Sequence, residues 1–465
     1  MEYIIGVILL LTFFALAWYC ISGHNLMIGF LIISIVWTIF AFGGTLGASA
    51  SFLESNEILN FKSLKDVIAA LNKIYQSAPE GWGTTLVNVC WGAWFGRVLM
   101  ETGIASTLIR KTVELGGDRP MVTITLLNIV TAIIFTAMTG AGPVIAIGVI
   151  VLPILMSLGV PKAIAMFSFM GSVAAGIFLN PVNFAQYRAF FITPEQMPEF
   201  TLGWYAAHFG YVALIIMLIT TTILSGIYLT RAKTSHAWAA RVNRGTDTKN
   251  APFYTLFLPI VPVVLKIWLD FSVIGGFVIA GFLALFLCGK MKGSFKENCQ
   301  LVNKLYYDGV VDTAPLVGFL LTLPMFNQVA SYAAPYFKVL LGGVFPKNEL
   351  VLCIVFAVLL FMGLFRGPMT LVGCGAATLG VLMNIGDFSV PFLYAIFAIP
   401  TITVNIGSCI TQSWVAWGLA YTKVESKDFL KLSIPNAYFA GILQYVATFI
   451  LLGSLGAGWL LSTVK

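Results

Sequence analysis

Met138-Thr139-Gly140-Ala141-Gly142-Pro143 and Leu364-Phe365-Arg366-Gly367-Pro368 contain the only two Gly-Pro dipeptides in this sequence of 465 residues. The two prolines lie 368 − 143 = 225 residues apart, which is about half of the chain. An asparagine follows each proline at the same distance, because 180 − 143 = 37 and 405 − 368 = 37. A Gly-Gly pair precedes each one at nearly the same distance, since 143 − 117 = 26 and 368 − 343 = 25. Three markers in one order and spacing predict a structural unit that occurs twice.

Gly-Pro dipeptides inside apolar segments predict interrupted helices. Proline removes a backbone donor, and glycine tolerates the dihedral angles that open the chain. Within hydrocarbon, free backbone groups must be packed in protein or line a wet cavity. Breaks at corresponding positions of two halves are the best pointer in a sequence to the substrate site of a secondary transporter. The alternative is that the spacing is a coincidence, because Gly and Pro are common in membrane helices.

The composition indicates an all-α polytopic membrane protein. Hydrophobic residues make up 59% of the chain, aromatic residues 14% and charged residues only 10%, whereas a soluble domain carries about 25% charged residues. The seven cysteines are scattered and suggest neither disulfides nor a metal site, and we expect no cofactor. The net charge of +7 comes from Lys and Arg in short loops, where it sets orientation in the lipid bilayer rather than binding nucleic acid.

We predict two inverted-topology repeats of about seven membrane segments each, with broken helices or re-entrant hairpins. Residues 1–230 form the first half, 231–252 a basic cytoplasmic linker, and 253–465 the second half. The first half has segments at about 3–21, 26–46, 82–100, 121–139, 143–159, 163–180 and 203–229. The second half has them at about 253–269, 271–289, 309–330, 349–366, 367–384, 390–407 and 436–462. The odd number in each half makes the second copy upside down relative to the first.

Arg366 is the strongest candidate for substrate binding, together with Gly367 beside it. An arginine within a membrane segment points to function, and its planar fork suits a carboxylate. The other explanation is an arginine at a helix end that snorkels to the interface. The counterpart in the first copy is 366 − 225 = 141, an uncharged alanine. The first break, with Thr139, Gly140 and Gly142, would therefore hold a cation or the polar end of the substrate.

Amides, hydroxyls and one carboxylate complete the candidate set. Amides and hydroxyls supply the donors and acceptors that a hydroxylated acid needs, although helix–helix hydrogen bonding or capping is their commoner use in membranes. The candidates for substrate binding are Asn180, Asn183, Thr403, Asn405 and, more weakly, Asn88. The candidates for ion coupling are Gly142, Asp312 and Ser408, and Asp312 would relay a proton or complete a Na⁺ site. The other carboxylate of this kind, Glu101, is expected to neutralise Arg97 on the same helix face.

The glycine-bearing span Trp91–Gly103, its continuation through Arg110-Lys111 and the Gly-rich breaks resemble the gluconate:proton symporter, anaerobic C4-dicarboxylate and citrate carriers of the ion-transporter superfamily. The resemblance implies a midplane site to which each repeat brings a hairpin and an unwound helix, an elevator-like mechanism, and a homodimer. It implies hairpins at 82–103 and 309–330 and unwound segments at 139–143 and 365–368. The Ser-Asn-Thr signatures of the better-defined dicarboxylate carriers are absent, so the resemblance determines neither the substrate nor Na⁺ coupling.

The leading hypothesis is a secondary active symporter of a small organic anion, such as a carboxylate or sugar acid, driven by H⁺ or Na⁺ in the cytoplasmic (inner) membrane. A Na⁺/H⁺ antiporter is the alternative and would depend on Asp312. The sequence contains no HExxH, GxSxG or GxxxxGK[ST] motif, which argues against an enzyme and against a primary pump. A channel is disfavoured only by the inverted repeat.

Overall fold

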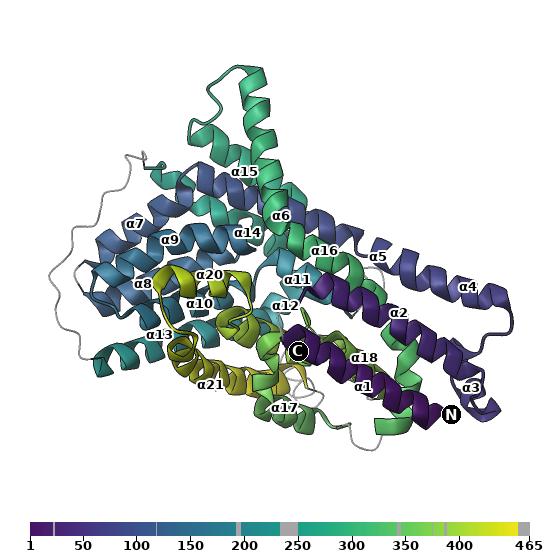
Figure 1. Cartoon of the computed structure of the whole chain (residues 1–465). Helices are drawn as coiled ribbons and strands as arrows, with labels where there is room; N and C mark the ends of the chain where they lie inside the picture. Colours follow the sequence, from purple (N-terminus) through teal and green to yellow (C-terminus); the bar gives the residue numbers. More distant parts are fainter. Residues whose placement is uncertain are drawn as a thin grey trace, which may run out of the picture.

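The computed structural model describes residues 1–21, 24–117, 119–191, 197–232, 250–341, 346–373, 375–385 and 388–453, and every regular element in these ranges is a helix (Figure 1). Most of the linker predicted at 231–252 lies outside the described residues. Three described helices are long and apolar enough to cross a bilayer: Met27–Thr45, Leu202–Arg231 and Ser426–Leu452. A fourth candidate is the bent pair Lys162–Ile177 and Pro181–Arg188, and seven further apolar helices are shorter.

The helices follow one another in two comparable runs. The first run is α1 (Glu2–Ile21), α2 (Leu26–Thr45), α3 (Ala50–Ser55), α4 (Leu64–Asn72), α5 (Ala78–Glu80), α6 (Gly83–Glu101), α7 (Ile104–Gly116), α8 (Pro120–Phe135), α9 (Ala141–Ser157), α10 (Lys162–Ile177), α11 (Pro181–Arg188), α12 (Leu202–Tyr205) and α13 (Tyr211–Arg231). The second run is α14 (Val261–Leu269), α15 (Val273–Leu287), α16 (Phe295–Leu341), α17 (Glu349–Val358), the 3₁₀ segment η5 (Leu360–Arg366), α18 (Gly375–Ile385), α19 (Val390–Ile399), the π-helical segment η6 (Pro400–Ile406), α20 (Ser413–Thr422) and α21 (Ser426–Leu452).

Helices near the start of each run pack on a long helix of the other run. α1 and α2 lie along α16, and α15 lies along α6 (Figure 1). The helices α6 and α16 also contact each other directly. They meet at Gly309, where a Cβ would come within 2.9 Å of the backbone of Ala93 and Trp94. This close approach brings α16 next to the first run.

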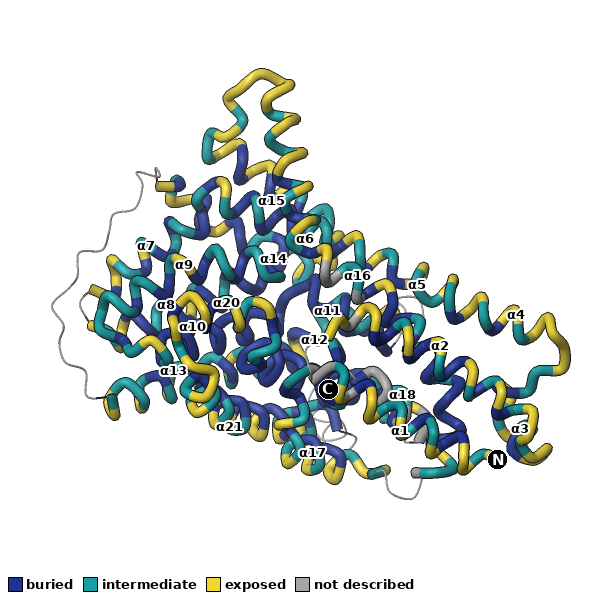
Figure 2. The backbone as a smooth tube through the Cα atoms, in the orientation of Figure 1, coloured by how far each residue is buried: buried dark blue, intermediate teal, exposed yellow. Residues whose placement is uncertain are grey.

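Two helices form the centre of the protein. All residues of α10 from Ile164 to Ile177 are buried, and so are all residues of α19 and η6 from Pro391 to Ile406. Figure 2 shows this buried backbone running through the interior. Small residues make the packing possible, because a Cβ at Gly176 would overlap the carbonyl of Ala132. Helix α10 therefore sits directly on the end of α8, where the first break begins.

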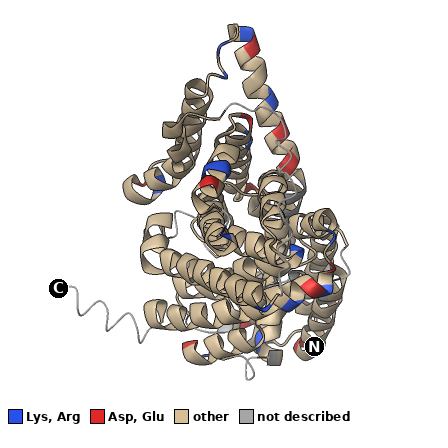
Figure 3. Cartoon of the chain, turned by 90° about the vertical axis from the view of Figure 1, so that its left-hand side faces the viewer, with Lys and Arg blue, Asp and Glu red and all other residues tan. Residues whose placement is uncertain are grey.

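The helix α16 differs from the sequence prediction. Its 47 residues extend for about 70 Å, more than twice the roughly 30 Å hydrocarbon core. The sequence predicts a separate segment at 309–330, and the resemblance implies hairpins there and at 82–103. Both expectations are wrong, because α16 continues to Leu341 and α6 is one helix from Gly83 to Glu101. Each proline inside the helix removes one backbone N–H donor. Neighbouring helices can satisfy the carbonyl that this leaves without a partner, so the helix continues. In the first run the corresponding boundary exists, because Gly103 takes a φ of 73° between α6 and α7. Figure 3 shows several charged residues along α16 towards its projecting end.

Candidate functional site

The first break separates α8 from α9. Helix α8 ends at Phe135, α9 begins at Ala141, and the intervening Gly140 has a φ of 97° that favours glycine. Pro143 lies within the first turn of α9, so the unwound stretch is 136–140 rather than the expected 139–143. The side chain of Asn180 holds this stretch, because its Nδ2 donates to the carbonyls of Phe135 and Met138, each at 3.1 Å.

The second break follows α17. Leu364 is extended (ψ 160°) and Phe365 is left-handed (φ 53°), and helical structure resumes only at Gly375 in α18. The N–H of Leu371 donates to Oγ1 of Thr401 at 3.0 Å, and the N–H of Phe365 donates to Sγ of Cys409 at 3.1 Å. The backbone of Arg366 ends η5, but its side chain lies outside the described part of the structure. The prediction that Arg366 and Gly367 bind substrate stays untested.

A cavity of about 710 Å³ opens beside the first break. Its wall comes from this break, one face of α11, the middle of α16, the start of α20 and the residues around the start of α2. Of the predicted candidates, the wall includes Thr139, Gly140, Asn183 and Asp312. The first residues of α9 and α20 also line it, so two helix N-termini with partial positive charge face the cavity. This arrangement favours an anion.

Two buried polar atoms at the cavity have no hydrogen-bond partner among the described residues. They are Oδ1 of Asn183, an acceptor, and Nε1 of Trp414, a donor. The Nδ2 of Asn183 is engaged, because it donates to the hydroxyl of Tyr187 at 3.2 Å. A buried polar group without a partner costs about 1–3 kcal/mol, so both atoms are suited to a bound ligand. Trp414 was missed in the sequence, where a tryptophan reads equally well as a packing residue or an interface anchor.

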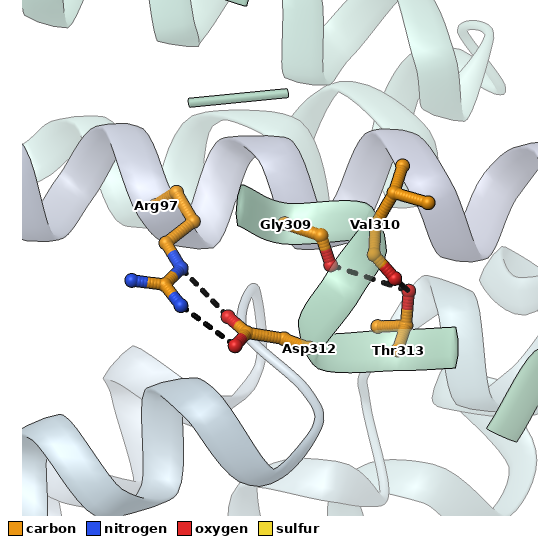
Figure 4. Close-up of polar contacts among 5 residues, drawn as sticks. All are labelled: Arg97, Gly309, Val310, Asp312 and Thr313. Carbon is orange, nitrogen blue, oxygen red and sulfur yellow. Dashed lines mark hydrogen bonds and ion pairs between the residues drawn. The ribbon is translucent and has the colours of Figure 1, made fainter. Parts of the chain in front are cut away.

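An ion pair between the two runs adjoins the cavity (Figure 4). The Nε of Arg97 donates to Oδ2 of Asp312 and Nη2 donates to Oδ1, both at 2.6 Å, in a bidentate arrangement. The carboxylate also adjoins the start of α9, because a Cβ at Gly142 would overlap it. The structure thus brings Gly142 and Asp312, two candidates for ion coupling, into contact.

The expected pairing of Arg97 with Glu101 is wrong. Glu101 instead accepts from the ammonium of Lys290 at 3.1 Å. A basic residue four positions before an acidic one is the weaker order on a helix. Asp312, by contrast, offers a planar match to the guanidinium at the crossing of α6 and α16.

Four other candidates lie away from this cavity and are fully or almost fully buried. Asn180 caps α11, since its Oδ1 accepts from the N–H groups of Val182 and Asn183. Thr403 donates to Oε1 of Gln444 at 2.7 Å, and Ser408 donates to the carbonyl of Ser433 at 3.4 Å. Neither side-chain polar atom of Asn405 has a partner among the described residues. These contacts are helix-capping and helix–helix bonds, the commoner use of such residues.

A second cavity, of about 1020 Å³, contains the remaining candidate, Asn88. Helix α11 borders both cavities with opposite faces. Asn183, Gln186 and Tyr187 face the first cavity, whereas Phe184, Ala185 and Arg188 face the second. Within the described ranges, no cluster of three or more His, Cys, Asp or Glu side chains is arranged to hold a metal ion. The short helix α11 therefore lies between these two cavities.

The fold matches that of a solved transporter. The crystal structure of the YdaH transporter of Alcanivorax borkumensis, described as having an unusual topology, superposes with a TM-score of 0.61 at 14% sequence identity. The match covers 94% of this chain and 99% of that one. No family model and no curated protein matches the sequence. Together with the apolar helices, the match defines an integral membrane protein with the all-helical fold of a transporter.

Proposed function

We propose that this protein is a secondary active transporter that carries a small organic anion, such as a carboxylate or sugar acid, in symport with H⁺ or Na⁺. The observation that carries the proposal is the 710 Å³ cavity, where the starts of α9 and α20 meet polar atoms of Asn183 and Trp414 that have no partner among the described residues. The shared fold with a solved transporter supports transport in general.

The cavity suits a hydroxylated acid. Its volume lies in the range of small-molecule sites, about 300–1,000 Å³. The helix starts and the indole N–H of Trp414 would stabilise a carboxylate, while Oδ1 of Asn183 would accept from a substrate hydroxyl. Thr139, Gln186 and Gln412 add further polar atoms to the wall. The protein groups themselves supply the recognition, so the proposal needs no cofactor.

The two cavities support an alternating mechanism. The similar order of helices in the two runs, and the packing of helices near the start of each run on the other run, agree with two inverted repeats. We propose that α11 separates the two access routes and moves with the substrate in an elevator-like step. By the same resemblance to known carriers, the protein would act as a homodimer in the cytoplasmic (inner) membrane.

Uptake into proteoliposomes tests the proposal. Labelled gluconate, citrate, fumarate and succinate are offered with pH and Na⁺ gradients imposed separately. We expect gradient-driven accumulation of at least one acid, with weaker apparent affinity in Trp414→Phe, which keeps an aromatic ring but removes the indole N–H donor. Absence of uptake for every acid tested would contradict the proposal for this substrate class.

A Na⁺/H⁺ antiporter remains the second candidate because Asp312 lines the cavity. The bidentate pairing with Arg97 weighs against it, since a neutralised carboxylate attracts a cation less. Release of protons on addition of Na⁺, without uptake of any anion, would favour the antiporter.

A further inference from the structure

We propose that Arg97 and Asp312 form an exchangeable ion pair in which the substrate carboxylate replaces Asp312 on Arg97 and Asp312 takes up the coupling proton. This inference rests on the proposed function and deepens it. It names Arg97 as the cation that binds the substrate and H⁺ as the ion that drives transport.

The position of the pair permits the exchange. Asp312 lies on the cavity wall and Arg97 lies next to it on α6 (Figure 4). The side chains are 33% (Arg97) and 17% (Asp312) exposed, so the pair is not sealed in the core. The Nη1 of Arg97 makes no hydrogen bond to any described residue, because only Nε and Nη2 are engaged. Arg97 itself lies behind the cavity wall that Asp312 lines, so an incoming anion would reach the guanidinium, and its Nη1 donor, beside Asp312.

The two ligands of Arg97 are chemically alike. A guanidinium binds both oxygens of a carboxylate in one plane, and the carboxylate of a substrate presents the same two oxygens as Asp312. Because Gly142 has no side chain, the start of α9 lies against this carboxylate position. The partial positive charge of that helix end would stabilise whichever carboxylate occupies the position.

The charge of the site explains why a proton would accompany the anion. Without substrate the site is neutral, since the charges of Arg97 and Asp312 cancel. A monovalent anion on Arg97 leaves Asp312 unpaired and brings the total to −1. A charge without a partner is costly in a non-aqueous site, so a proton from water binds to Asp312 and restores neutrality. Arg97 stays protonated throughout. The site would cross the membrane interior readily only when it is neutral, either without substrate or with one anion and one proton bound.

Few other ionisable groups surround the pair. Asp308 lies one turn earlier on α16 and acts on Arg97 through its charge. His24, next to α2, and Tyr187 of α11 line the same cavity, and Glu101 of α6 is engaged with Lys290. The residues with which α9 and α20 line the cavity have no ionisable side chains. Substitutions of Asp308 and Glu101 therefore serve as matched controls, because each removes a nearby negative charge without removing the carboxylate that binds Arg97.

The test compares Asp312→Asn and Arg97→Gln with the controls Asp308→Asn and Glu101→Gln in proteoliposomes. Three quantities are measured: accumulation of the anion under a pH gradient, exchange of internal for external anion without a gradient, and protons taken up per anion with a pH-sensitive dye. We expect Asp312→Asn to retain exchange but to lose accumulation at least about tenfold, because the amide cannot take up the proton. Arg97→Gln should weaken anion binding by about 10- to 100-fold.

Each remaining outcome has a defined meaning. Accumulation by Asp312→Asn with the proton-to-anion ratio of the wild type would overturn the exchange, as would accumulation driven by Na⁺ without proton uptake. If the wild type carries no anion, the proposed function itself fails, and the inference fails with it. If a single variant does not fold, the double variant Arg97→Gln/Asp312→Asn leaves no unpaired charge. It should fold but bind the anion about 10- to 100-fold more weakly than the wild type, and normal anion binding by it would overturn the proposal.

Discussion

Asn180 and Asn405 follow the two Gly-Pro dipeptides at the same distance, and both side chains are fully buried. Asn180 makes four hydrogen bonds, two to the carbonyls of the first break and two from the backbone of α11. Asn405 makes none with its side chain among the described residues. Equivalent positions in the sequence have thus taken different roles in the structure.

The second break is tied by the neighbours of Asn405. Thr401 lies four residues before it and binds the N–H of Leu371, while Cys409 lies four residues after it and accepts from Phe365. Each contact satisfies a single backbone group. In the first break one amide bridges two carbonyls and caps the next helix at once. The comparison teaches that the repeated spacing places a break without determining which side chain stabilises it.

Replacing Asn180 with Ala should have the largest effect on stability. The change leaves two buried carbonyls and two buried N–H groups without partners, and we expect a loss of about 3–4 kcal/mol. Asn180→Ser can still cap α11 but cannot reach Phe135 and Met138, so it should lose about half as much. Thermal unfolding in detergent measures both variants. Equal stability of Asn180→Ala and the wild type would remove the contrast with Asn405.

Substitution of the glycine in each Gly-Pro dipeptide should separate an effect on stability from an effect on transport. A Cβ at Gly367 would overlap the carbonyl of Met362, so Gly367→Ala must move the backbone and should cost about 2 kcal/mol. At Gly142 the overlap is with the carboxylate of Asp312, a side chain that can shift. We expect Gly142→Ala to fold but to transport at least about tenfold more slowly, because the ion pair is displaced. Normal uptake by Gly142→Ala would show that the position of Asp312 does not matter.

Thr401→Val tests whether the second break depends on one hydroxyl. The valine keeps the shape but leaves the buried N–H of Leu371 without a partner, for an expected loss of about 1 kcal/mol. Thr403→Val is the matched control in the same segment, since it breaks a bond to Gln444 of α21 and leaves the break intact. Hydrogen exchange of the peptides around 367–373 should rise only in Thr401→Val. An equal rise in both variants would mean that η6 as a whole is loosened.

Asn405→Leu should have the smallest effect on stability. Removing a buried amide that has no partner among the described residues relieves its desolvation cost, so we expect a change within about 1 kcal/mol, in either direction. Uptake then decides the role of the residue. Normal uptake would leave Asn405 without a function in transport, whereas reduced uptake at normal stability would support the prediction that it binds substrate. A large loss of stability would indicate that its amide has partners after all.

The signals in the sequence that singled out part of the candidate site are local. Glycine and proline chemistry predicted the breaks to within a few residues, and Thr139, Gly140, Asn183 and Asp312 line one cavity. Three expectations failed: the separate segment at 309–330, the hairpins at 82–103 and 309–330, and the pairing of Arg97 with Glu101. All three relied on residues that are close in sequence. Contacts from distant helices decided the structure instead.

The sequence by itself determined the membrane class, the helical architecture and the positions of the two breaks. These follow from apolar length and from backbone chemistry, which act within a few residues. Only the tertiary structure decided that Arg97 binds Asp312, 215 residues away, and that α11 lies between two cavities. It also decided that the side chain of Asn180 is hydrogen-bonded, while that of Asn405 has no partner among the described residues. The physical reason is that such contacts depend on how helices far apart in the chain pack together.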